Sequence, residues 1–345
     1  MASLIFLTSA PQTVEEGSGT WVGISMLRAA IEALGHQVTL VAPPGSSHIG
    51  FNLHARSIVR RMNADAVIGF DLDGVFVERR HVAAIKGVLA DEAQYERGIS
   101  RLALSMQAWL EGMHVRRAER VIATSGYSAE RIAKFYGVDR QKIRVVPELI
   151  DLGVWERALR AAPIEPGPPR VLCVAHLYRR KCVDVLLRAF AQVGGDAVLR
   201  IAGVGPEKSR LERLARRLAI AERVDFLGHL PFTRLVAEYR NATLFALPSV
   251  QEGFGIVFIE AMASSLPIVA ARAAAVPEVV VDESTGILVP PRDDTALATA
   301  LTKLLDDASI RRAMGSAGRE HVRQFDAPVV AQKFLEAVGA DAKHL

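Results

Sequence analysis

The chain of 345 residues has only two cysteines, Cys173 and Cys182, which are too few for a disulfide framework, and neither stands in a metal-ligand spacing. No apolar run approaches the roughly 18 residues of a transmembrane helix. Residues 1–8 lack the basic start and the long apolar stretch of a signal peptide, so they predict a first strand. These absences predict a protein of the reducing cytoplasm.

An excess of charge of one sign is missing as well. The chain holds 42 basic and 38 acidic residues, a net charge of +4, and neither half is strongly basic. This balance argues against a nucleic-acid partner. A hydrophobic content of 50% and the length indicate a globular protein with two domains, each large enough for its own core.

The most informative stretch lies between two apolar runs of strand length, residues 242–246 and 266–271. Between these runs, glycines alternate with Phe254, and apolar residues then recur at helical spacing. The pattern predicts a strand, a tight loop, a helix and another strand. Gly253 and Gly255 permit backbone angles and close approaches that a side chain would block.

The N–H groups of Phe254, Gly255 and Ile256 would lie at the N-terminus of that helix, where an anion such as a diphosphate binds readily. Glu252 lies in the loop, and Glu260 follows Ile256 by four residues on the same helix face. A carboxylate does not bind phosphate, but it accepts hydrogen bonds from sugar hydroxyls. An anion site between two such acceptors suits a ligand made of sugar, diphosphate and ribose.

The start of the chain predicts a doubly wound α/β domain. A strand over residues 4–8 leads into a glycine loop, a helix over residues 22–34 and a strand over residues 37–42. Gly17 and Gly19 lie in the loop without the third glycine of a dinucleotide fingerprint, so NAD binding is a weak interpretation. A tight turn and a ligand-facing loop remain equally open for these two glycines.

Glu252 and Glu260, with seven residues between them that include Gly253-Phe254-Gly255, resemble the E-x7-E motif of the retaining glycosyltransferases of family 4, which have the GT-B fold. Further segments match the family in the expected order: Pro248-Ser249, Leu266-Pro267-Ile268-Val269-Ala270, Pro277-Glu278-Val279-Val280 and Thr285-Gly286-Ile287-Leu288-Val289. Such an ordered series is more specific than a lone motif.

The resemblance implies two Rossmann-like doubly wound domains that face a cleft. Residues 1–165 would form the acceptor-side domain, residues 166–325 the nucleotide-sugar-binding domain, and residues 326–345 a C-terminal helix that packs back on the first domain. A linker with four prolines, residues 162–169, would separate the two domains.

The segment 175–184 resembles the family's Gly-Arg-Leu…Lys-Gly segment, whose Arg and Lys bind the donor diphosphate. Lys181 matches this Lys, whereas His176 takes the place of the Arg and Cys182 that of the Gly. A lysine binds phosphate as a point charge, and a histidine would be a weaker substitute that depends on pH. The turn with Gly203 and Gly205 also matches the family.

Two positions near the first domain's sheet depart from the family. Lys86 stands where the family has a histidine near the donor sugar, and a lysine there could bind phosphate or an acidic acceptor. Glu148 begins the segment where the family has Asn-Gly-Val-Asp, and only the final Asp151 is kept. The Asp71-x-Asp73 pair has the spelling of a metal site, but we interpret it as a solvated turn, since the fold needs no metal.

The resemblance implies a retaining enzyme that moves a hexose from a UDP- or GDP-linked donor to an acceptor hydroxyl by front-face substitution. The candidate catalytic residues are Lys181, Glu252 and Lys86. The candidate donor-binding residues are Gly17, Gly19, His176, Lys181, Gly203, Gly205, Glu252, Gly253, Phe254, Gly255, Ile256 and Glu260. We expect no cofactor and no metal, because basic groups and amides stabilise the departing diphosphate instead.

Two alternatives stay open: a sugar-nucleotide 2-epimerase, and a non-catalytic protein that binds sugar nucleotides. The oligomeric state is open too. Two arginine groups are candidates for a weak peripheral contact with an anionic membrane, although no clear amphipathic apolar face accompanies them in the sequence. These groups are Arg56/Arg60/Arg61 and Arg116/Arg117/Arg120.

Overall fold

The computed structural model describes residues 1–10, 19–42, 48–78 and 80–340. Its contacts divide the chain into two compact units. The first unit comprises Met1–Leu149 together with Phe325–Leu345, and the second comprises Ile150–Gln324. Gly17 lies outside the described residues.

The described part of the first unit contains a parallel sheet of six strands, most of which are connected along the chain through helices. In spatial order the strands are β2 (Gln37–Val41), β1 (Ser3–Leu7), β3 (Ala66–Phe70), β4 (Val82–Ile85), β5 (Arg120–Ala123) and β6 (Ile143–Val145). The helices are α1 (Gly19–Ala33), α2 (His48–Arg61), α3 (Leu89–Glu92), α4 (Gly98–Arg117), α5 (Gly126–Tyr136) and α14 (Ala327–Val338). The strand order reverses between β1 and β3, as in a doubly wound sheet.

The second unit repeats this plan with another six-stranded parallel sheet among the described residues. Its strands, in spatial order, are β12 (Gly286–Val289), β11 (Ile268–Ala271), β10 (Leu244–Leu247), β7 (Arg170–Val174), β8 (Val198–Ala202) and β9 (Val224–Gly228). Its helices are α6 (Leu152–Ala161), α7 (Val183–Phe190), α8 (Lys208–Arg217), α9 (Phe232–Asn241), α10 (Ile256–Ala263), α11 (Val276–Val279), α12 (Asp294–Asp306) and α13 (Ala308–His321). Here the order reverses between β7 and β10, which places the loops after these two strands next to each other.

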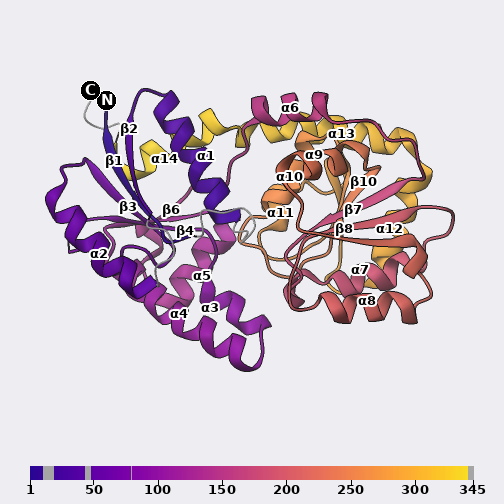
Figure 1. Ribbon diagram of the computed structural model, residues 1–345, viewed down its shortest axis with the longest axis horizontal. Helices are drawn as coiled ribbons and strands as arrows, with labels where there is room; N and C mark the ends of the chain where they lie inside the picture. Colours follow the sequence, from indigo (N-terminus) through magenta and orange to yellow (C-terminus); the bar gives the residue numbers. More distant parts are fainter. Residues whose placement is uncertain (11–18, 43–47, 79, 341–345) are drawn as a thin grey trace. The chain divides into compact units, whose positions relative to one another are not determined.

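The last helix belongs to the first unit, as the resemblance predicted. Asp326 caps α14 by accepting a hydrogen bond from the Ala327 N–H, and α14 then packs against α1 (Figure 1). Phe334 of α14 meets Phe6 of β1 edge to face, with the ring centroids 6.0 Å apart. The buried apolar residues of α14 share one core with β1 and α1, so burial of this face holds the end of the chain on the first unit.

The boundary between the two units lies after Leu149, earlier in the chain than the boundary after residue 165 that the sequence interpretation gave. The sequence placed α6 in the first domain, but α6 packs against α9 and α10 of the second unit. The Trp155 indole N–H donates to the Ser264 hydroxyl at 3.0 Å, and the Trp155 ring lies against Tyr239. This large buried side chain therefore fastens α6 to the second unit.

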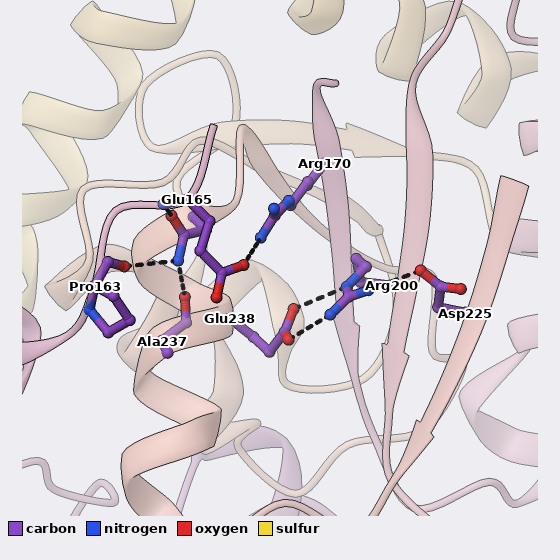
Figure 2. Close-up of polar contacts among 8 residues, drawn as sticks. Pro163, Glu165, Arg170, Arg200, Asp225, Ala237 and Glu238 are labelled. Carbon is purple, nitrogen blue, oxygen red and sulfur yellow. Dashed lines mark hydrogen bonds and ion pairs between the residues drawn. The ribbon is translucent and has the colours of Figure 1, made fainter. Parts of the chain in front are cut away.

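The proline-rich segment after α6 is also tied to the second unit. Asn241 is the last residue of α9, and its side-chain amide nitrogen donates to the carbonyls of Pro163 and Ala237 at 3.0 and 2.8 Å; these two residues are labelled in Figure 2. The Asn241 side-chain oxygen accepts the Glu165 N–H at 2.7 Å. A single side chain thus satisfies backbone groups of both the segment and the helix.

Arg200 joins helix α9 to the sheet of the second unit. Its guanidinium on β8 forms two hydrogen bonds with Glu238 of α9, at 3.0 and 2.6 Å, and a third with Asp225 of β9, at 2.7 Å (Figure 2). A planar guanidinium matches two carboxylate oxygens at once, so it joins helix and sheet in a fixed orientation.

Three helix ends can be compared with the sequence predictions, and two of them need correction. Gly137 ends α5 in the left-handed conformation, as predicted. Ser125, and not Ser128, caps α5: its side chain accepts a hydrogen bond from the Ser128 N–H. The helix predicted over residues 100–120 ends at Arg117, because Arg120 already begins β5. Within the described residues, no helix is both long and apolar enough to cross a membrane.

Candidate functional site

Two loops of the second unit meet where its strand order reverses. One follows β7 and includes the 3-10 helix η4 (Arg179–Lys181), and the other follows β10 and leads into α10. The Val250 N–H donates to the Arg180 carbonyl at 2.9 Å, and the Arg180 guanidinium donates to the Gln251 side chain at 3.0 Å. These bonds hold the two loops together at the carboxyl ends of the strands, which is where open α/β sheets bind ligands.

Lys181 and Glu252 form an ion pair across these loops. The Lys181 Nζ lies 2.6 Å from the Glu252 Oε1, and the two side chains are only 14% and 8% exposed. Removal of both charges from water has a cost that the pair offsets by its own attraction. The structure thus brings together the residue predicted for the diphosphate and the residue predicted for the transferred sugar.

The start of α10 adds a polar backbone site beside this pair. Gly255 occupies the N-cap position in the left-handed conformation, with φ at 91°, and no side chain caps the helix. A Cβ at this position would lie 2.6 Å from the Phe258 ring. Glycine is therefore required here, and the first amides of α10 point toward the loop with the partial positive charge of a helix end.

Glu260 lies one turn inside α10 and has a partner that the sequence did not reveal. The Tyr239 hydroxyl donates to the Glu260 Oε2 at 2.8 Å. Burial raises the pKa of the Glu260 carboxyl to about 7, although the hydrogen bond from Tyr239 lowers it. Tyr239 itself is fully buried and stacks on Phe245 of β10, so the sheet fixes the position of this carboxyl.

Gly203 and Gly205 support the loop that carries His176. A Cβ at Gly203 would lie 1.9 Å from the Ala175 carbonyl oxygen, and one at Gly205 would lie 2.6 Å from the Leu177 nitrogen. The Leu177 N–H donates to the Val204 carbonyl at 2.8 Å. Both glycines are thus needed for the contact of two backbones, and a direct donor contact of either one stays a prediction.

The two residues that replace the family's Arg and Gly, His176 and Cys182, differ in their exposure to solvent. The His176 side chain is exposed and its ring lies 6.5 Å from that of Tyr178. Cys182 is buried in the left-handed conformation, with φ at 50°, which explains why glycine suits this position. Burial also raises the pKa of the Cys182 thiol, so it is no ready nucleophile.

The first unit holds a second ion pair, between the two residues that depart from the family pattern. The Lys86 Nζ lies 2.8 Å from the Glu148 Oε2, and the side chains are 13% and 12% exposed. Lys86 follows β4 and Glu148 follows β6, so both lie at the carboxyl edge of the first sheet. Gly23 of α1 leaves room for them, because a Cβ there would lie 3.1 Å from Glu148.

The Asp71-x-Asp73 segment is not the solvated turn that the sequence suggested. Asp73 is 3% exposed, and its carboxylate accepts hydrogen bonds from Ser9 and from the Asn52 side chain. Asp71 accepts the Lys86 N–H at 2.8 Å, and burial raises the pKa of its carboxyl to about 7. The described residues contain no cluster of three or more metal-ligating side chains.

The remaining predicted glycines give less information. Gly19 is the first residue of α1, so the helix begins before the predicted start at residue 22. Phe254 is buried in the loop before α10. Sequence reasoning did not find Tyr239 or Gln251, because each acts through a contact with a residue distant in the sequence.

The chain has two doubly wound units, which is the architecture of the GT-B class of α/β proteins. In the second unit, a lysine, two glutamates and a helix N-terminus lie where the strand order reverses. The model named "Glycosyl transferases group 1" matches residues 156–321, and the model named "Glycosyltransferase Family 4" matches residues 78–154. The chain belongs to this family of glycosyltransferases, as the E-x7-E resemblance predicted.

Two similar proteins have been named as glycosyltransferases of defined substrates. A D-inositol 3-phosphate glycosyltransferase of Nocardia farcinica is 35% identical over 274 residues, which is 75% of this chain and 59% of the relative. A GDP-mannose-dependent alpha-(1-6)-phosphatidylinositol monomannoside mannosyltransferase of Mycolicibacterium smegmatis is 39% identical over 161 residues, 44% of this chain and 42% of the relative. The chain thus spans about three fifths of the Nocardia protein.

Solved structures share the whole fold. Sucrose-phosphate synthase from Thermosynechococcus elongatus superposes with a TM-score of 0.81 at 21% identity, and 100% of each chain is covered. The Anabaena protein HepE, solved with UDP-glucose, gives a TM-score of 0.79 at 18% identity, with 99% of this chain and 100% of HepE covered. At such identities the likeness concerns the fold.

Proposed function

We propose that this protein is a retaining glycosyltransferase that moves a hexose from a nucleotide-diphosphate sugar to an acceptor hydroxyl. The observation that carries the proposal is the Lys181–Glu252 pair, 2.6 Å long, beside the N-terminus of α10, which has no side-chain cap. It combines a cation and helix amides for a diphosphate with a carboxylate for sugar hydroxyls. One relative is a GDP-mannose-dependent mannosyltransferase, and HepE, a protein of similar fold, was solved with UDP-glucose, which favours a UDP- or GDP-linked donor.

Each group has a distinct task in this proposal. Lys181 and the amides of residues 254–256 bind the diphosphate and stabilise its growing charge as it departs. Glu252 accepts hydrogen bonds from the donor sugar, and Glu260 from the ribose. Exposed His176 supplies a second, weaker contact with phosphate, and Lys86 binds an acidic group of the acceptor.

The reaction proceeds on one face of the sugar. The bond from the anomeric carbon to the phosphate oxygen breaks, and a bond from the acceptor oxygen forms on the same face. The acceptor proton passes to the departing phosphate oxygen, so the configuration is retained without a covalent enzyme intermediate. In this scheme the chain supplies positioning and charge stabilisation and needs no metal, because Lys181 and the α10 amides act on the leaving group.

The arginines of the first unit extend the proposal to the surroundings of the enzyme. We place the protein in the cytoplasm, with weak peripheral contact to an anionic membrane where a lipid acceptor would be met. The acceptor itself is an alcohol, and the names of the relatives offer both inositol phosphates and phosphatidylinositol mannosides for trial.

The proposal is tested by turnover with defined donors. The protein is incubated with UDP- and GDP-hexoses, with and without inositol 3-phosphate, after dialysis against EDTA. We expect release of the nucleoside diphosphate and a product whose anomeric configuration matches the donor. Activity that disappears with EDTA and returns with Mg²⁺ would contradict the metal-free scheme, and tight donor binding without any release or transfer would favour a binding protein. Conversion of the donor into its 2-epimeric sugar nucleotide, without transfer to the acceptor, would favour the epimerase.

A further inference from the structure

Helix α4 exposes an unusual row of large apolar side chains. Ile99 is 88% exposed, Leu102 68%, Met106 68% and Trp109 62%. These residues follow one another at spacings of three, four and three, so they lie on one face of the helix. We call these four residues the α4 stripe. Scattered single exposed apolar residues are ordinary, but a continuous row indicates a surface that contacts something apolar.

The stripe faces away from its own unit. The opposite face of α4 is buried and includes Ala108, Gly112 and Val115. This face packs against α3, α5 and the 3-10 helix η2 (Ala93–Tyr95) (Figure 1). Helix α4 therefore packs on its unit through the opposite face, and the stripe takes no part in that packing.

The exposed charged side chains of α4, and of Arg97 just before it, are all positive. Arg97 and Arg101 are exposed near its start, and Arg116 and Arg117 are exposed in the last turn. Arg116 and Arg117 donate to the backbone carbonyls of Tyr136 and Val75, which leaves their positive charges unneutralised by those contacts. The lone carboxyl group of α4 belongs to Glu111, which is fully buried and hydrogen-bonded to the Tyr136 hydroxyl.

The other arginine group of the first unit differs. Arg56 and Arg60 of α2 both pair with the carboxylate of Glu78. That carboxylate offsets part of their charge and occupies their donor groups. Of the two arginine groups singled out in the sequence, the one that includes Arg116 and Arg117 of α4 is therefore the better match for an anionic surface. The structure also supplies the apolar face that the sequence analysis did not find.

We propose that the α4 stripe and its arginines form a peripheral binding surface for an anionic lipid bilayer. Ile99, Leu102, Met106 and Trp109 enter the boundary between headgroups and acyl chains, and the arginines contact lipid phosphates. Trp109 suits this depth because its ring is apolar and its indole N–H is polar. The inference rests on the proposed membrane contact of this enzyme and is independent of the transfer chemistry.

The test uses the full chain without donor. Sedimentation with vesicles of phosphatidylcholine, alone or mixed with phosphatidylglycerol, measures binding. We expect binding to the anionic vesicles, weakened by salt, and a loss of about tenfold or more in the double variant Leu102→Ser/Met106→Ser. The matched control Ile164→Ser/Val329→Ser removes apolar side chains that are 74% and 41% exposed elsewhere, and it should bind like wild type. Equal binding by all three proteins would overturn the proposal.

Two further readouts separate the alternatives. Brominated lipids should quench the fluorescence of Trp109, and Trp109→Phe should lose this quenching while it still sediments with the vesicles. The wild-type protein could instead fail to bind vesicles and elute as a dimer, with the Leu102→Ser/Met106→Ser variant eluting as a monomer. In that case a second copy covers the stripe and the lipid proposal is wrong. Thermal unfolding checks that the variants fold. Vesicle binding without any turnover would count against the proposed function alone, and turnover without vesicle binding would count against the stripe alone.

Discussion

Glu260 shows how burial of a single carboxyl group links the site to pH. The folded protein holds the Glu260 proton up to a pKa of about 7, whereas the unfolded chain releases it near the ordinary value of 4.5. Protonation thus favours the folded state, and this contribution is complete below pH 4.5 and is lost as pH rises to 7. Relative to Glu260→Gln, wild type should lose about 1–3 kcal/mol of unfolding free energy across this window.

Urea unfolding of both proteins from pH 4.5 to 8 measures this difference. Tyr239→Phe is the matched variant, because it removes the hydrogen bond that lowers the Glu260 pKa and should move the midpoint to higher pH. If the difference in unfolding free energy between wild type and Glu260→Gln does not change with pH, the pKa of Glu260 is not raised in the folded protein.

Lys86 and Glu148 offer a second test at the scale of residues. Each side chain is almost buried, so removal of one partner leaves the other charge poorly solvated. The double-mutant cycle of Lys86→Ala and Glu148→Ala should show a coupling of about 1–3 kcal/mol in the unfolding free energy. The cycle for Arg28 and Glu32, both 40% exposed on α1, should give only about 0.5 kcal/mol or less. Additive losses at Lys86 and Glu148 would mean that the ion pair does not form in solution.

The element that the site depends on most is the start of α10. Gly255→Ala places a methyl group 2.6 Å from the Phe258 ring in a left-handed backbone, and should cost about 1–3 kcal/mol of stability. Relief of this contact displaces the α10 amides, so affinity for a nucleoside diphosphate should fall by about tenfold or more.

Gly194→Ala is the control for this substitution, since its Cβ would meet no atom within 4 Å. Thermal unfolding and calorimetric titration measure both variants. If Gly255→Ala binds the nucleotide as wild type does, the helix start is not part of the anion site.

Sequence patterns predicted these elements well where the signal is local. The glycine after Tyr136 marked the end of α5, and the apolar runs around Glu252 marked β10, α10 and β11. The partners of the site were not predictable in the same way. Tyr239 and Glu260, or Lys86 and Glu148, are far apart in the chain, and only the fold brings them within 2.8 Å. The α4 stripe was missed for a related reason, because its helix is apolar on both faces and the sequence does not say which face is buried.

At the scale of the whole chain, each unit carries its own set of the residues discussed above. Lys181, Glu252 and Glu260 belong to the second unit, whereas Lys86, Glu148 and the α4 stripe belong to the first. Helix α6 and the segment after it stay with the second unit, because Trp155 and Asn241 hold them there. The order of elements predicted the two doubly wound units. The boundary between the units was predicted at the proline-rich segment 162–169, because the sequence does not show the side-chain contacts that attach α6 and this segment to the second unit.

The account depends above all on a diphosphate bound at Lys181. Calorimetric titration of the full chain with UDP and GDP measures this directly. Lys181→Ala should weaken the preferred nucleotide by about 10- to 100-fold, the effect of one hydrogen bond to a charged group. Lys208→Ala, which removes an exposed lysine of the same unit, should leave the affinity unchanged. A folded Lys181→Ala protein that binds the nucleotide as tightly as wild type would contradict the account.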